Sequence, residues 1–187
     1  MRKIGLVVLL IVLVGFASGC ISSGDSATET APPATQTPQT TQMGDKEYVI
    51  VNGTKIYLGE VYFYMYGMRT CPHCQKMKEE IPKEYGADHL VYYELLDNEE
   101  NTKLFSEQYK YTGIGGVPAI AITYNGTLYA IIEGEYNVSA TPRIIKAAMD
   151  NDGMVLFVGG QAYIIKDKSV IDKLYAIYVE HRMPEGG

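Results

Sequence analysis

Tryptophan is absent from the 187-residue sequence, and cysteine occurs only three times. Three cysteines in a chain of this length exclude a small fold held together by a dense disulfide network. Basic residues are also few, with 16 Lys and Arg against 22 Asp and Glu and a formal net charge of −6. Because this balance offers no basic surface for phosphates, we expect no nucleic-acid partner.

Long apolar runs are equally scarce, since only the first twenty residues are apolar for long enough to engage a bilayer. This pattern excludes a protein with several membrane spans. The composition as a whole, with 47% hydrophobic and 20% charged residues, is that of one ordinary folded domain.

Met1–Cys20 has the three parts of an export signal, namely Arg2-Lys3, an apolar run over residues 4–16 and small residues before Cys20. The Cys after small residues resembles the lipobox of prokaryotic lipoproteins, which implies a signal peptide over residues 1–19 and lipidation of Cys20. The alternative is an uncleaved signal anchor. Both interpretations predict an extracytoplasmic protein attached to the cell membrane.

Residues 20–45 follow as a segment rich in Ser, Thr, Pro, Gln and Ala, with almost no large apolar side chain. Such a segment buries too little surface to offset the entropy of ordering it, so we expect a disordered linker. The folded domain is then expected over residues 46–187.

Alternating apolar residues, turn dipeptides and helix signals predict an α/β domain. Asn52-Gly53, Asn125-Gly126 and Gly159-Gly160 each separate two β-prone runs, as in hairpins. We expect strands over 48–51, 54–58, 61–66, 90–96, 117–124, 127–132, 155–158 and 161–165, and helices over 71–80, 98–109, 141–149 and 168–182.

The motif Cys71-Pro72-His73-Cys74 falls where a predicted strand leads into a predicted helix. Cysteines three apart on a first helical turn lie within reach of a disulfide, with the first exposed and the second turned inward. The free N–H groups and the dipole of the helix favour a Cys71 thiolate. Positive charge nearby would add to this effect, and it is supplied by Arg69, His73, Lys76 and Lys78.

Two other interpretations of this motif are a static disulfide and half of a zinc site. A bridge between Cys71 and Cys74 closes almost no loop and so would stabilise little. Zinc needs four ligands, and beside the two thiols the domain offers only His73, His89 and His181, with no second paired cluster. We therefore favour a redox motif and expect no metal.

The sequence resembles the thioredoxin-like thiol-disulfide oxidoreductases, in both the 71–74 motif and the run Gly113–Ile120 with its Val117-Pro118. The Pro72-His73 pair and Val117 are similar to DsbA-type oxidases. The resemblance, over about residues 60–151, implies a thioredoxin-like fold whose central mixed β-sheet is flanked by helices. The N-terminal and C-terminal hairpins and the last helix would be additions to that core.

The resemblance also implies the roles of individual residues. Pro118 would be cis and packed against the active site, and the Val117 backbone would pair with an extended substrate. The redox-active Cys71–Cys74 disulfide would replace any cofactor. The family carries a buried acid six residues before the nucleophile, but Met65 stands there. This position leaves the proton of Cys74 without an assigned acceptor.

These observations predict a membrane-anchored oxidoreductase that exchanges disulfides with exported proteins, acting as an oxidant. A membrane redox partner would recycle its cysteine pair. The alternatives are a reductase for cytochrome or metal-site maturation and a non-enzymatic metal-binding or chaperone module. The segments flanking the core are expected to cover its edges rather than form a dimer surface.

Overall fold

The structure is a computed structural model that describes residues 40–42 and 47–186. The predicted signal peptide, the lipidation site at Cys20 and most of the predicted linker lie outside the described residues. Within the described ranges, no helix is both long and apolar enough to cross a bilayer.

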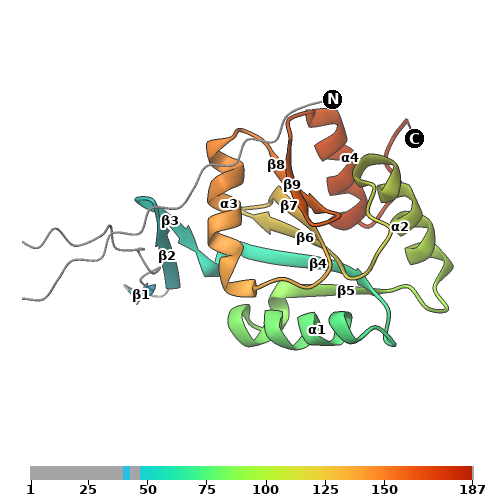
Figure 1. Cartoon of the computed structure of the whole chain (residues 1–187), viewed down its shortest axis with the longest axis horizontal. Coiled ribbons are helices and arrows are strands. Elements are labelled where there is room, and N and C mark those ends of the chain that lie inside the picture. Colours follow the sequence, from blue (N-terminus) through green and yellow to red (C-terminus); the bar gives the residue numbers. More distant parts are fainter. Residues whose placement is uncertain (1–39, 43–46, 187) are drawn as a thin grey trace, which may run out of the picture. The chain divides into compact units, whose positions relative to one another are not determined.

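A six-stranded mixed sheet forms the centre of the domain (Figure 1). The strand order is β5-β4-β6-β7-β8-β9. The pairs β4/β5 and β7/β8 are parallel, and the other neighbours are antiparallel. The strands span Val61–Gly67 (β4), Leu90–Glu94 (β5), Ala119–Tyr124 (β6), Thr127–Glu133 (β7), Met154–Val158 (β8) and Gln161–Ile165 (β9). The predicted central mixed sheet is therefore confirmed.

Both faces of this sheet are covered, which explains why every residue of β6 is buried. On β4, Phe63 and Met65 face one apolar cluster, whereas Tyr66 faces the other. The first cluster includes residues of α1 (Pro72–Tyr85) and α3 (Thr141–Asp150). The second includes residues of α2 (Glu99–Thr112) and α4 (Lys168–Tyr178), which lie side by side (Figure 1). The helices thus flank the sheet as the sequence predicted.

The two hairpins that flank the core differ in how they relate to the central sheet. The C-terminal hairpin β8–β9 extends the central sheet beyond β7. The N-terminal hairpin, β2 (Glu47–Val51) and β3 (Thr54–Tyr57), instead belongs to a separate three-stranded sheet. Its Val51 and Ile56 side chains still join the first apolar cluster. This hairpin therefore covers the core without adding to the sheet.

The third strand of that small sheet, β1 (Thr40–Gln42), lies in the segment predicted as a linker. It pairs antiparallel with β2. Threonine has a high β propensity, and the free edge of β2 offers backbone partners that composition alone does not reveal. These three residues therefore form a strand in the structure, and the disordered linker stays a prediction.

Two helix ends also differ from the sequence prediction. Helix α1 continues past Pro82 to Tyr85, because the buried side chains of Ile81 and Tyr85 anchor its last turn in the core. Helix α4 ends at Tyr178 rather than at residue 182. There the His181 backbone is left-handed, with φ of 51°, and its imidazole stacks on Tyr93. Short 3-10 helices span Leu58–Glu60, Ala87–His89 and Val138–Ala140.

Gly153 is required where the chain enters β8. A Cβ atom there would lie 2.7 Å from the carbonyl oxygen of Ile165 and 2.8 Å from a methyl carbon of Ile164. We predict that Gly153→Ala lowers the free energy of unfolding by about 1 to 3 kcal/mol, because backbone must move. At Gly59 a Cβ meets no atom within 4 Å, so Gly59→Ala should stay within about 0.5 kcal/mol of wild type. Chemical denaturation measures the free energy of unfolding of both variants. A Gly153→Ala variant as stable as Gly59→Ala would contradict the close packing at the start of β8.

Candidate active site

The cysteine motif lies where β4 leads into α1. Strand β4 ends at Gly67, and α1 begins at Pro72, whose missing N–H is harmless in a first helical turn. Cys71 is the residue that caps this helix. Its Sγ accepts a hydrogen bond from the backbone N–H of Cys74 over 3.2 Å. Charge on the Cys71 sulfur would therefore meet both a backbone donor and the positive end of the helix dipole.

The two thiols have unequal surroundings. Cys71 is partly exposed, whereas Cys74 is fully buried. Burial, followed by the hydrogen bond to Cys71, raises the pKa of Cys74 to about 12. At neutral pH Cys74 is therefore a thiol, and Cys71 is the sulfur that a second molecule can reach. The structure thus gives the two thiols unequal environments, and the roles of Cys71 as attacking and Cys74 as resolving cysteine stay a prediction.

The Val117–Pro118 segment lies directly against this motif. The Val117–Pro118 peptide bond is cis. The Cys71 thiol donates to the Val117 carbonyl oxygen over 3.7 Å, although the two residues are 46 positions apart. The fold therefore brings together both sequence blocks that carried the family resemblance. The pairing of the Val117 backbone with a substrate remains a prediction.

Glu133 hydrogen-bonds to the loop that contains Val117 and Pro118. The sequence analysis did not identify this residue. Its carboxylate accepts from the Gly116 N–H over 3.1 Å and from the Gly159 N–H over 3.0 Å. The Gly134 N–H also donates to the Pro118 carbonyl over 2.8 Å. The Asn-Gly turn between β6 and β7 fixes a register in which Glu133 lies opposite Ala119. That register was the sequence signal that could have placed Glu133 here.

His73 and Lys76 meet a second acid that the sequence analysis missed, Glu135. His73 Nδ1 lies 2.9 Å from one Glu135 carboxylate oxygen, and Lys76 Nζ lies 3.3 Å from the other. The hydrogen bonds from His73 and Lys76 lower the pKa of Glu135, so this carboxylate is ionised at neutral pH. The positive charge that the sequence predicted from these two residues is therefore opposed.

The other two predicted cations also have partners. Arg69 forms ion pairs with Asp97 at 2.5 Å and with Glu94 at 3.9 Å. Lys78 Nζ lies 4.0 Å above the centre of the Tyr92 ring. Sequence order places the four cations near the motif but does not reveal the acids and the aromatic ring that tertiary folding brings to them.

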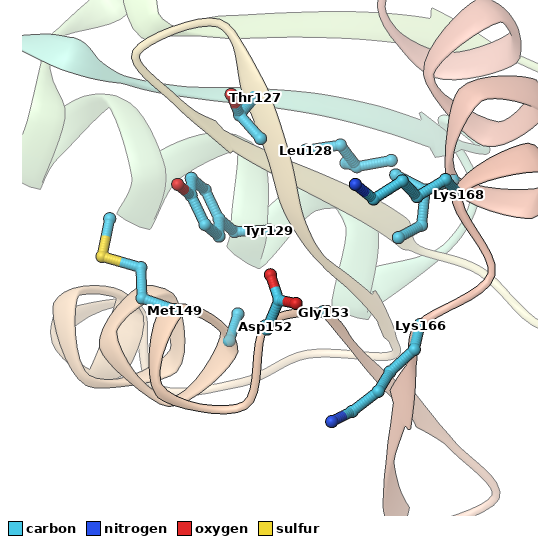
Figure 2. A pocket seen from close by; sticks show the side chains of 10 residues that line it. Thr127, Leu128, Tyr129, Met149, Asp152, Gly153, Lys166 and Lys168 are labelled. Carbon is cyan, nitrogen blue, oxygen red and sulfur yellow. The ribbon is translucent and has the colours of Figure 1, made fainter.

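A pocket of about 510 Å³ opens elsewhere on the domain, between β7, the end of α3 and the approach to α4 (Figure 2). Lys166, Lys168 and Asp152 are among its lining residues, and none of the predicted site residues is. Among the described residues, no group of three or more His, Cys, Asp and Glu side chains is arranged to hold a metal ion. The reactive groups that the structure brings together are those around Cys71.

Comparison with known proteins identifies the family of the domain. Residues 57–161 match the family model for a thioredoxin-like domain, which covers more than half of the chain. No curated protein and no solved structure matches the sequence. The chain belongs to the thioredoxin-like family.

The charge arrangement around His73 predicts how quickly Cys71 reacts. Glu135→Gln removes the acid opposing His73 and Lys76, so iodoacetamide should alkylate Cys71 about two- to fivefold faster at neutral pH. His73→Gln should slow the reaction by a similar factor. Glu180→Gln, which removes a carboxylate paired with Arg182, serves as the control. Equal rates for wild type and Glu135→Gln at low salt would contradict this electrostatic account.

Proposed function

We propose that this member of the thioredoxin-like family is a thiol-disulfide oxidoreductase that acts on exported proteins, most directly as a disulfide donor. One observation carries the proposal. The Cys71 sulfur caps α1 and lies beside the Val117 carbonyl, with the Cys74 thiol buried behind it. This arrangement suits a sulfur that is alternately bonded to a substrate and to its neighbour.

In the reducing direction, the Cys71 thiolate attacks one sulfur of a substrate disulfide and releases the other as a thiolate. Cys74 then attacks Cys71 and displaces the second substrate sulfur. The substrate gains two electrons, and the protein is left with a Cys71–Cys74 disulfide. As a donor the protein runs these steps in reverse, so a substrate thiolate attacks Cys71 and Cys74 leaves as the first thiolate.

The donor direction is supported by the hydrogen bond from the Cys74 N–H to the Cys71 sulfur. Stabilising a thiolate stabilises the reduced protein, which makes its disulfide a stronger oxidant. A reductase is the second candidate, because Glu135 opposes the charges of His73 and Lys76 and weakens that stabilisation. The proposed function therefore depends on which effect dominates at Cys71.

We further propose that the domain works outside the cytoplasm, held to the membrane through lipidated Cys20 or an uncleaved anchor. The export signal in the first twenty residues supports this location. Its protein substrates would carry thiols or disulfides of their own. A membrane redox protein would restore the Cys71–Cys74 pair after each cycle, since a disulfide donor ends its reaction reduced.

Substitution of each cysteine tests the reaction. The full chain should reduce insulin with a thiol reductant and should oxidise a reduced test protein. Cys71→Ser should abolish both activities, whereas Cys74→Ser should accumulate a mixed disulfide on Cys71. Thr70→Ser, next to the motif, is the matched control and should retain wild-type rates. An active Cys71→Ser variant would contradict the proposal, and bound stoichiometric metal without exchange activity would favour a metal-binding module.

The direction of electron flow is tested by the redox equilibrium with glutathione. We expect the Cys71–Cys74 couple to lie nearer to about −120 mV, the value of a strong disulfide donor, than to about −270 mV. Acid-quenched alkylation followed by mass spectrometry measures the oxidised fraction at each glutathione ratio. A potential close to that of thioredoxin would instead identify the protein as a reductase.

A further inference from the structure

The Cys74 thiol must lose its proton before or as its sulfur attacks Cys71. Its sulfur is fully buried, so solvent does not reach it directly. Met65, at the position where the family carries an acid, is buried and pairs in register with Tyr92 on the neighbouring strand β5. Because Met65 cannot accept the proton of Cys74, we consider the side chains of the neighbouring strand β5 as acceptors.

Gly67 shows how close Tyr92 comes to Cys74. A Cβ atom built on Gly67 would lie 3.2 Å from Cys74 Sγ and 3.2 Å from Tyr92 Oη. The sulfur and the phenol oxygen are thus no farther apart than twice this distance, a gap that about one water molecule can bridge. Because Gly67 has no side chain, both groups approach the same position at the end of β4.

Tyr92 is held in turn by Glu94, on the same face of β5. Its hydroxyl donates to Glu94 Oε2 over 3.2 Å. The other carboxylate oxygen accepts from the backbone N–H groups of Leu96, over 3.0 Å, and Arg69, over 3.2 Å. Although desolvation raises the pKa of Glu94, the Leu96 and Arg69 N–H groups outweigh it and lower the pKa below its ordinary value. Glu94 is about one-quarter exposed, so it also reaches water.

We propose that Tyr92 and Glu94 form the proton path of the resolving cysteine, connecting the buried Cys74 sulfur to solvent. This inference rests on the proposed oxidoreductase function and concerns only its second step. Tyr92 is the group that lies near the reacting thiol, and Glu94 acts through Tyr92.

The protons balance along this path. As the Cys74 sulfur bonds to Cys71 Sγ, its proton passes to the Tyr92 oxygen, and the Tyr92 hydroxyl proton passes to Glu94. Glu94 then releases that proton to water. Because the proton leaves while the sulfur–sulfur bond forms, a carboxylate that is a weaker base than free Cys74 thiolate still serves as the acceptor. In the donor direction the same path returns a proton to Cys74 as it leaves Cys71.

The remaining charged groups around Cys74 are compatible with this path. Cys71 shares a hydrogen bond with Cys74 and loses its charge once a substrate is attached. Arg69 lies 3.9 Å from Glu94, where it favours the ionised carboxylate. Lys78 lies over the Tyr92 ring. Burial, followed by the charge of Glu94, raises the pKa of Tyr92, so its phenol is neutral at rest and passes a proton on rather than holding a charge.

Rapid-quench kinetics with oxidised glutathione isolates the second step. Reduced full chain first forms a mixed disulfide with glutathione on Cys71, and Cys74 then resolves it in a step that is independent of glutathione concentration. Mass spectrometry distinguishes the reduced, glutathionylated and disulfide forms. We expect Tyr92→Phe to slow the resolving step about 10- to 100-fold and to leave the first step unchanged.

Glu94→Gln keeps a polar partner for Tyr92 but cannot accept the proton, so it should slow the resolving step similarly. Tyr93→Phe is the matched control, because the Tyr93 hydroxyl bonds to the Tyr178 carbonyl oxygen and joins the opposite apolar cluster. It should resolve the mixed disulfide at the wild-type rate. An unchanged free energy of unfolding verifies that each variant is folded.

The pH profile distinguishes a proton path from a merely structural role. Without the path, solvent hydroxide must remove the Cys74 proton, so resolution in Tyr92→Phe should accelerate roughly tenfold per pH unit between about pH 7 and about pH 9. The wild-type step should depend much less on pH. Wild-type resolution rates in Tyr92→Phe, or in Glu94→Gln alone, would overturn the path. A wild-type chain that never forms the mixed disulfide would instead overturn the proposed function.

Discussion

The reactive site depends on one contact, the hydrogen bond from the Cys74 N–H to the Cys71 sulfur at the first turn of α1. The same helical turn that places a donor beside Cys71 turns the Cys74 side chain into the core, where burial raises its pKa to about 12. Opposite environments for the two thiols therefore follow from a single backbone geometry. The Val117 carbonyl oxygen lies 3.7 Å from the same sulfur.

The surrounding sheet determines which charges act on this contact. Pro118 precedes β6 and Glu133 ends β7, and the pairing of Ala119 with Glu133 holds the loop beside Cys71 against the end of β7. Glu135, just past this strand, then opposes two of the cations on α1. Strand β5 supplies Tyr92 and Glu94 on the inner side of the motif. In the proposed mechanism, Glu135 acts on the attacking sulfur, and Tyr92 and Glu94 serve the resolving one.

Local patterns in the sequence were sufficient for most of the fold and for the cysteine pair. Turn dipeptides such as Asn125-Gly126 and the strand-to-helix position of Cys71 are short-range signals, and both were read correctly. Glu135 and Tyr92 were missed because their roles arise from contacts between distant segments. The end of α4 was misplaced for the same reason, since His181 leaves the helix to bond Asn101 on α2 and to stack on Tyr93.

The proposed mechanism requires that Cys74 is a thiol at neutral pH. A carbon-13 NMR titration of the reduced chain, labelled at the cysteine Cβ atoms, measures its ionisation directly. The Cys74 resonance should stay at its thiol position until the pH approaches about 12. A Cys74 resonance that moves to its thiolate position near neutral pH would contradict the mechanism.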